Sequence, residues 1–182
     1  MSLALERLLE GPVEDVAPGL LGLRIRTELP SGPTEVLISE VEAYAGGRDP
    51  ASHAYGGQTP RNASMFGRRG TLYVYRSYGI HWCMNIVTGG PGDPSAVLLR
   101  AGRPLIGADV MARRRGRATN LTDGPGKLTQ ALGVTGDADG STVWDGPVRL
   151  LPGPERHGQI IASPRVGISK AVAWPWRFVL VE

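Results

Sequence analysis

The chain has 182 residues, of which 41% are hydrophobic and 20% charged, a length and composition that suit one domain with its own buried core. Its single cysteine, Cys83, excludes an internal disulfide and a cysteine-based zinc site, so we expect a reducing, cytoplasmic setting. No stretch approaches the roughly 20 apolar residues that span a bilayer, and the charges within residues 1–16 are unlike a signal peptide, so we expect no membrane association.

The net charge is small, at +3, from 20 basic and 17 acidic residues. All the basic residues except Lys127 and Lys170 are arginines. A guanidinium binds phosphate through two parallel hydrogen bonds, so this preference suits a phosphate-rich partner, although a coding preference for arginine explains it as well. The placement of the charges is therefore more informative than their number.

The first half of the chain predicts one helix and four strands. Residues 1–16 predict a short helix, and residues 20–47 predict two strands around a turn at Pro30 to Pro33. Residues 48–70 have no periodicity and many turn-forming residues, which predicts a long loop, and such loops are often functional. Residues 71–77 and 81–88 predict the two strands of a hairpin.

The second half predicts further strands with two helices between them. Residues 95–105 predict a strand, and residues 107–117 a short helix with four arginines at the end where the helix dipole favours cations. Residues 123–134 predict a helix with Asp123 as its N-cap, and residues 159–169 and 176–182 predict closing strands. No boundary is visible, so we expect a single α+β domain over residues 1–182 with an antiparallel sheet.

All five tyrosines lie between positions 44 and 78, and Tyr78 lies in the predicted hairpin turn. Its ring either lies back on the sheet or serves as a wedge between stacked bases. A two-residue turn would pair Tyr75 with Trp82, whereas an odd-length loop would put Tyr75 on the same face as Asn85; the sequence is compatible with both. The second register gives a face with a ring and an amide, which suits a planar heterocycle.

Glu40, Glu42 and Tyr44 share one face of a predicted strand. Two neighbouring carboxylates beside an aromatic ring suit acid–base chemistry, because the pKa of one is raised by the other. The same spacing would also be found in an exposed edge strand, where the carboxylates face only solvent. However, the same face begins with Val36 and Ile38, which indicates that it enters a buried region before it presents the carboxylates.

Three further features involve single residues. His53 lies in the long loop, and because neither His81 nor His157 has ligand spacing to it, we expect no metal. Arg61 follows in the same loop, close to the tyrosines, and basic residues among aromatic ones are typical of nucleic-acid binding. Lys127 lies in "GPGKLTQAL", which is either a phosphate site at a helix N-terminus or ordinary helix initiation.

These motifs together are specific. The segments "SEVEAYAGGRDPASHAYGGQTPRNASMFGRRGTLYVYRSYGIHWCMN", "AVLLRAGRPL", "GPGKLTQALGV" and "PRVGI" closely resemble the alkyladenine (3-methyladenine, N-methylpurine) DNA glycosylase family, in order, from about position 19 to about 180. The resemblance implies an α+β domain with a curved antiparallel β-sheet, surrounding helices and a protruding DNA-intercalating β-hairpin. It also implies a monomeric, monofunctional hydrolase without cofactor, which acts on double-stranded DNA containing damaged purines, in the nucleoid if the source is bacterial.

The family's functional residues match positions of this chain one by one. Glu42 matches the general base, and Arg100 the residue that helps to hold the attacking water. Tyr78 matches the tyrosine that fills the gap left by a flipped nucleotide. The remaining matches are the base-pocket residues Tyr44, His53, Tyr75, Asn85 and Val166, the last through its main chain, and the DNA backbone or stack contacts Arg61, Met65 and Lys127.

The expected reaction is hydrolysis of the N-glycosidic bond of a flipped purine such as 3-methyladenine or hypoxanthine, which initiates base excision repair. The chain departs from the vertebrate relatives by lacking an arginine between Gly57 and Gln58, which removes one potential phosphate contact. Two alternatives come from other functional classes. One is a non-enzymatic protein that binds damaged or single-stranded DNA, and the other is a nucleotide-binding enzyme with "GPGK" as its phosphate site.

Overall fold

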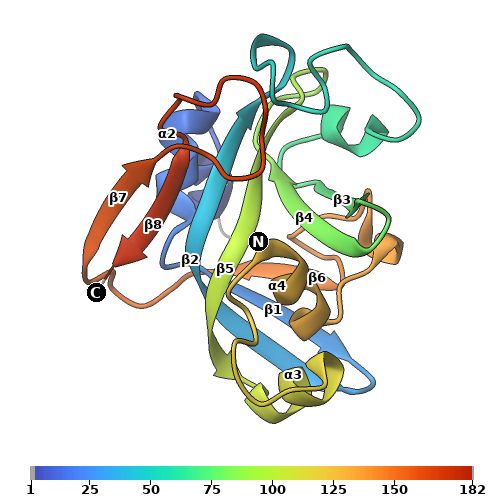
Figure 1. The fold of residues 1–182 in the computed structure, drawn as a ribbon, viewed down its shortest axis with the longest axis vertical. Helices are drawn as coiled ribbons and strands as arrows, with labels where there is room; N and C mark the ends of the chain where they lie inside the picture. Colours follow the sequence, from blue (N-terminus) through green and yellow to red (C-terminus); the bar gives the residue numbers. More distant parts are fainter. Residues whose placement is uncertain (1–2, 182) are drawn as a thin grey trace.

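An eight-stranded antiparallel sheet is the frame of the structure, a computed structural model that describes residues 3–181 (Figure 1). Its strands are β1 Arg24–Leu29, β2 Gly32–Ala45, β3 Leu72–Ser77, β4 His81–Val87, β5 Ser95–Ile106, β6 Val148–Leu151, β7 Gln159–Ser163 and β8 Arg177–Val181. The order is β3-β4-β5-β2-β1-β6, and β8 joins β2 to β7. Because β2 pairs first with β1 and then with β8 along the same edge, the sheet curls into a half-barrel (Figure 1).

Irregular pairing in the centre of the sheet causes part of this curl. The register between β2 and β5 shifts on both sides of Glu40, so that Glu40 pairs with Ala101 while Val41 pairs with Leu99. Arg100 is therefore the extra residue of a bulge. Bulges bend a strand and re-aim its side chains, and this one lies where β2 leaves β1 and meets β8.

Four α-helices pack around the sheet within residues 3–181: α1 Leu3–Leu8, α2 Val13–Leu20, α3 Ala108–Arg115 and α4 Pro125–Leu132. The predicted single helix over residues 1–16 is wrong, since Gly11 has a φ of 113° and Pro12 follows it, which separates α1 from α2; residues 1–2 of that prediction lie outside the described part. α2 packs against β2 and β5, and α4 against β4 and β5.

The core has two parts. The main cluster joins α2, α4 and the sheet through side chains such as Leu20, Ile38 and Leu132, each of which contributes about 1.5–3 kcal/mol on burial. The smaller cluster lies under the 48–70 loop and contains Ala54, Met65, Tyr73, Val87 and Ala96. The long predicted loop is confirmed, with two short 3-10 turns at Gly46–Arg48 and Ala63–Phe66, and the second cluster anchors it to the sheet.

Other expectations for single elements had mixed outcomes. The paired strands of the hairpin and the β1–β2 pair are confirmed. Both closing strands are present, but the first ends at Ser163 and residue 182 lies outside the described part; β6 was not predicted. Asp123 is not the N-cap of α4, because Gly124 takes that position and Asp123 instead pairs with Lys127, with both oxygens 3.1 Å from Nζ. No helix among residues 3–181 is both long and apolar enough to cross a membrane.

Candidate active site

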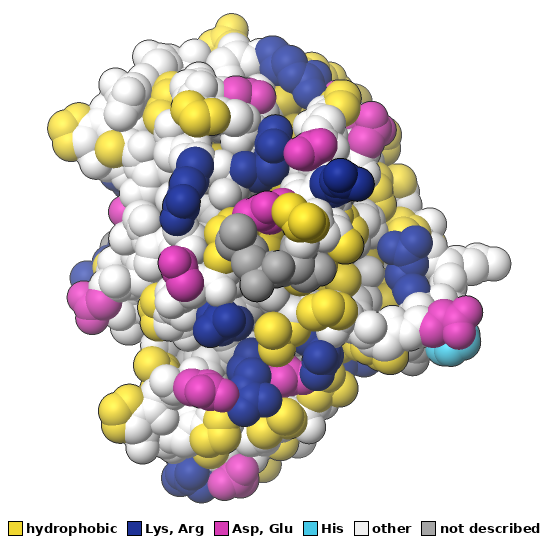
Figure 2. Space-filling view, turned by 180° about the vertical axis from the view of Figure 1, so that it is seen from behind, with side chains coloured by type: hydrophobic (Ala, Val, Ile, Leu, Met, Phe, Trp, Pro, Cys, Tyr) yellow, Lys and Arg dark blue, Asp and Glu magenta, His cyan; other side chains and the backbone are white. Residues whose placement is uncertain are grey.

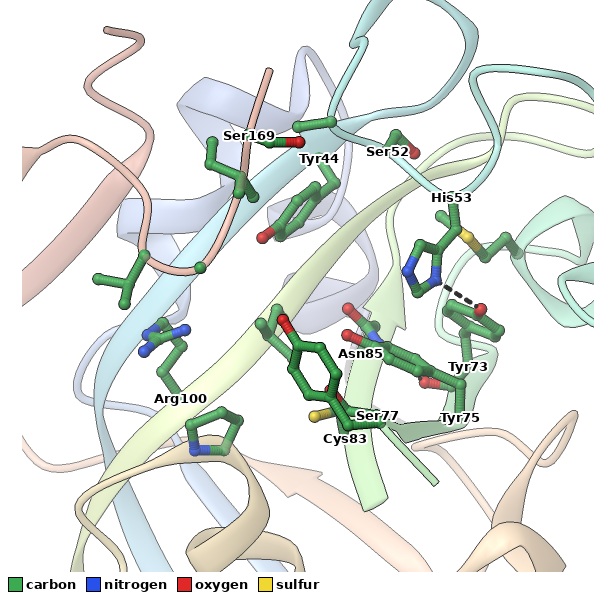
Figure 3. Close-up of a pocket in the computed structure, with 18 of the residues that line it drawn as sticks. Tyr44, Ser52, His53, Tyr73, Tyr75, Ser77, Cys83, Asn85, Arg100 and Ser169 are labelled. Carbon is green, nitrogen blue, oxygen red and sulfur yellow. Dashed lines mark hydrogen bonds between the residues drawn. The ribbon is translucent and has the colours of Figure 1, made fainter. Parts of the chain in front are cut away.

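A cavity of about 770 Å³ opens where the hairpin, the centre of the sheet and two loops meet (Figure 3). Its walls come from β2 to β5, from the 48–70 loop, from the hairpin turn, from the start of α4 and from residues 166–170. The predicted base-pocket residues Tyr44, His53, Tyr75, Asn85 and Val166 all line it, as do Arg61, Met65, Tyr78 and Arg100. The structure thus brings together residues that are up to 122 positions apart, from Tyr44 to Val166.

The hairpin has an odd-length loop. Ser77 pairs with His81, so Tyr78, Gly79 and Ile80 form a three-residue turn, and Tyr75 is opposite Cys83. This register puts Tyr75 and Asn85 on one face, as the base-pocket prediction requires. Tyr78 and Gly79 have φ values of 50° and 68°, and the Tyr78 side chain is 86% exposed. This exposure rules out a ring that lies back on the sheet.

An aromatic cluster forms one wall of the cavity. The His53 ring meets the Tyr75 ring edge-on at 4.5 Å, and the Tyr73 and Tyr75 rings stack at 5.2 Å. Figure 3 shows Tyr44 and Arg100 on the other side of the cavity from His53, Tyr73 and Tyr75. The space between these walls has planar groups on both sides, which suits a flat aromatic ligand.

Tyr73 is not among the predicted site residues, but its hydroxyl lies 2.9 Å from His53 Nδ1 and its carbonyl accepts a hydrogen bond from the Asn85 amide at 3.0 Å. It therefore orients two pocket side chains at once. Burial raises the pKa of Tyr73 to about 12, so the hydroxyl keeps its proton. Burial, together with the charge of Arg61, lowers the pKa of His53 below its ordinary value, which favours a neutral imidazole. The position of Tyr73 two residues before Tyr75 was the available sequence signal.

Glu42 is fully buried behind Tyr44, Arg100 and Val166. Its Oε1 accepts a hydrogen bond from the Val166 backbone N–H at 2.7 Å, and its Oε2 accepts one from the Tyr44 hydroxyl at 2.9 Å. Arg100 Nη1 lies 3.4 Å from Oε1. This separation exceeds the 2.7–2.9 Å of a good charged hydrogen bond, so both groups keep capacity for a shared third partner such as water.

Glu40 has a different environment from Glu42. Its Oε1 accepts hydrogen bonds from Arg100 Nε at 2.8 Å and Arg177 Nε at 2.7 Å. Burial raises the pKa of Glu40, but these two guanidinium groups outweigh it and hold the pKa below the ordinary value. The expected rise from carboxylate repulsion is therefore wrong for Glu40. The carboxylates in turn hold the pKa of Arg100 above its usual value despite burial, so Arg100 stays charged.

The predicted DNA contacts differ in their surroundings. Arg61 is exposed and donates to the Arg76 carbonyl at 3.2 Å, whereas Met65 is buried in the cluster beneath the cavity wall. Lys127 lies outside the cavity and is paired with Asp123. Lys170, which the sequence interpretation left without a role, lines the cavity, and its Nζ lies 6.0 Å from the Tyr55 ring centroid.

The arginines of α3 serve mainly to join elements. Arg114 donates to the Gly32 and Ala131 carbonyls at 3.0 Å each, which ties the β1–β2 turn to α4. Arg113 pairs with Asp109 and Arg115 with Gln130. Within residues 3–181 no group of three or more His, Cys, Asp or Glu side chains is arranged to hold a metal ion.

Comparisons with known proteins agree on one family. Residues 7–182 match the family described as Methylpurine-DNA glycosylase (MPG). Three relatives share the name "Putative 3-methyladenine DNA glycosylase". One from Frankia casuarinae is 49% identical over 183 residues, which cover 93% of this chain and 84% of the relative. Those from Rhodopseudomonas palustris (strain BisB18) and Agrobacterium fabrum are 51% and 52% identical, and the matches cover 92% and 91% of this chain and 82% of each relative.

These matches extend over nearly the whole chain, so they include the hairpin, the cavity walls and the central strands. They favour an enzyme over the alternative of a non-enzymatic binding protein. The chain therefore belongs to the methylpurine-DNA glycosylase family and is a DNA glycosylase, a DNA-repair enzyme whose substrate is DNA.

Proposed function

We propose that the enzyme rotates an alkylated or deaminated purine out of duplex DNA into the cavity and hydrolyses its N-glycosidic bond with water activated by Glu42. The observation that carries this proposal is the buried Glu42 carboxylate, whose two oxygens are held by fixed donors directly behind an aromatic-walled cavity. A volume of about 770 Å³ lies within the usual range of roughly 300–1,000 Å³ for small-ligand sites.

The flipped base would be held by stacking. The scissile bond cannot be reached inside the base stack, and extrusion costs a few kcal/mol, least for damaged or mispaired bases. Tyr44, His53 and Tyr75 would enclose the base, and the ring faces would attract a cationic purine such as 3-methyladenine. A neutral His53 supports this role, since it does not repel that cation. Tyr78, exposed at the hairpin turn, would fill the gap in the stack.

Selection against normal guanine would depend on Asn85. Its amide nitrogen is fixed by the Tyr73 carbonyl, so its orientation in the cavity wall is set before a base arrives. A fixed polar group in a buried wall rejects a base that cannot pair with it, because the mismatch leaves a desolvated group without a partner.

The chemical step would consume one water molecule. Arg100 and the main chain at Val166 would hold the water, and Glu42 would take one of its protons as the oxygen attacks the anomeric carbon. The bond from that carbon to the purine nitrogen breaks, and its electron pair leaves with the base. A cationic 3-methyladenine thereby becomes neutral, whereas hypoxanthine must also gain a proton. The Glu42 carboxylate would further stabilise the positive charge that develops on the sugar.

The test is Glu42→Gln, which keeps the shape of the side chain and an acceptor oxygen. We expect single-turnover excision of hypoxanthine to fall by about 10²- to 10⁴-fold, the usual contribution of a general base, while binding of the lesion duplex is retained. Glu28→Gln is the matched control, since Glu28 is an exposed carboxylate of β1 away from the cavity. Near-normal excision by Glu42→Gln would refute the role of Glu42.

The range of lesions is tested separately with the wild-type enzyme. Duplexes that each contain 3-methyladenine, hypoxanthine, ethenoadenine or 7-methylguanine are incubated to completion, and the released base is measured. The proposal requires release of at least one of these purines with an intact sugar–phosphate strand, as expected for a monofunctional hydrolase. Strand cleavage that accompanies release would indicate a lyase step instead.

A further inference from the structure

A fully buried ion pair lies directly behind the catalytic carboxylate. Arg165 and Asp49 have side chains with no exposed surface, and they interact through two hydrogen bonds, from Nη1 to Oδ2 at 2.5 Å and from Nη2 to Oδ1 at 2.9 Å. Arg165 Nη1 also donates to the Ala43 carbonyl at 2.8 Å. Asp49 accepts from the Ala45 and Ala51 backbone N–H groups. The pair therefore fastens the segment after β7 to the end of β2.

The guanidinium also contacts three aromatic rings. Its carbon lies 4.6 Å from the Tyr44 ring centroid, 5.3 Å from that of Trp176 and 5.9 Å from that of Trp174. Cation–π contacts are strongest when the cation is desolvated, as it is here. One of these rings belongs to the side chain that donates to Glu42.

Arg165 thus contacts both structures that hold the Glu42 carboxylate. The next residue, Val166, supplies the N–H that binds Oε1, and Tyr44, under the guanidinium, supplies the hydroxyl that binds Oε2. Burial of an ion pair carries a large desolvation cost for each charge, and apolar residues would pack the same space at least as well. Packing alone therefore does not explain why a charged pair is here.

We propose that Arg165, held by Asp49, is a positioning residue that sets both hydrogen bonds to Glu42 and so aims its carboxylate at the attacking water. This inference rests on the proposed role of Glu42. It predicts that a change in Arg165 impairs the chemical step and leaves lesion binding largely intact. Misplacement of a catalytic group by about 1 Å can cost about 100-fold in rate.

The main test is a double-mutant cycle with Arg165→Lys and Glu42→Gln. Lysine keeps the charge but cannot make the bidentate contact with Asp49. We expect Arg165→Lys to slow single-turnover excision by about 10- to 100-fold, with the dissociation constant for lesion DNA changed by only a few-fold. In the Glu42→Gln background the same change should slow excision hardly further, because the group that it positions is already lost.

Arg24→Lys is the matched control, because Arg24 pairs with the buried Glu35 at 2.8 Å in the same sheet but does not line the cavity. It should lower thermal stability without changing the excision rate of the folded enzyme. If Arg165→Lys does not fold, Asp49→Asn, which keeps the size and one acceptor oxygen, is put through the same cycle.

Two results would overturn the inference. One is an equal loss of rate from the Arg165 or Asp49 variant in both backgrounds, which means that it acts independently of Glu42. The other is a loss of lesion binding in proportion to excision, which indicates a general structural role. A failure of the proposed function has a different signature, since Glu42→Gln alone would then retain normal excision.

Discussion

At the scale of single residues, the cavity depends on side chains that hold other side chains in place. Tyr73 is 1% exposed, yet its hydroxyl holds His53 and its carbonyl holds Asn85. Arg165 likewise contacts the Tyr44 ring and directly precedes Val166, and these two residues donate the hydrogen bonds to Glu42. A site with the proposed role of reading a planar base gains precision when its walls are fixed by such bonds in advance.

Tyr73→Phe tests this fixing of the wall. The change removes the partner of His53 Nδ1, so we expect about 1 kcal/mol lower stability and excision slowed by about 10-fold as the imidazole loses its fixed orientation. Thermal unfolding and single-turnover excision measure the two effects. Tyr55→Phe removes the same hydroxyl from a ring that is 52% exposed and should change neither. Equal rates for the two variants would show that the His53 contact has no role in catalysis.

The sequence predicts the cavity-lining residues better than the ones behind them. Strand alternation puts Glu42 and Tyr44 on one face, and the family resemblance assigns them roles; Tyr44 lines the cavity and Glu42 is buried directly behind it. Arg165 could not be found in this way, because its partners Asp49 and Tyr44 are more than 100 positions away and come together only through the curl of the sheet. The prediction of Asp123 as an N-cap is wrong because an aspartate just before a helix can either cap the helix or pair with a lysine four residues later, as it does here with Lys127.

At the scale of elements, the β3–β4 hairpin combines a rigid base with an exposed turn. Its strands are paired from Leu72–Ile86 to Ser77–His81, while Tyr78 stands in the left-handed region with a φ of 50°. A non-glycine residue at such a φ costs roughly 1 kcal/mol or more, and the exposed ring gains nothing from packing. The turn is therefore better explained by an external partner than by folding.

Tyr78→Ala should impair insertion of the hairpin turn into DNA without changing the stability of the fold. We expect the free energy of unfolding to change by less than about 0.5 kcal/mol, as for most exposed sites. The flipped state should become less populated, because the gap in the stack is no longer filled, and the fluorescence of an ethenoadenine in the duplex on binding measures this. Ile80→Ala, in the same turn and 68% exposed, is the control. Unchanged flipping by Tyr78→Ala would contradict the wedge role.

Two structural features give no clear sequence pattern, each for a physical reason. β6 has only four residues, Val148–Leu151, too few for alternation to stand out. The bulge at Arg100 leaves no signature in β5, whose residues 95–99 are uniformly apolar or small. That bulge nevertheless directs Arg100 between Glu40 and Glu42. The position of Arg100 therefore depends on the register between β2 and β5, which the composition of these strands does not reveal.

At the scale of the whole molecule, the placement of the charges is more informative than their sum. On the face turned away from the viewer in Figure 1, basic and acidic side chains are intermixed (Figure 2). The net charge of +3 therefore does not mark a DNA surface by itself. At the cavity, Arg61 and Lys170 line the wall without an ion pair to any described carboxylate, whereas Lys127 lies outside it and is paired with Asp123.

This difference predicts unequal roles for the two lysines. An unpaired cation that meets a phosphate releases a counterion, so Lys170→Ala should lower the slope of log K against log salt for lesion-duplex binding by about one. Lys127→Ala should lower it less, because that lysine must first give up Asp123, an exchange of one partner for another. Binding titrations at several salt concentrations measure both slopes. A larger effect of Lys127→Ala would mean that the start of α4, and not the 166–170 segment, carries the phosphate contact, and that the Asp123 pair breaks when DNA binds.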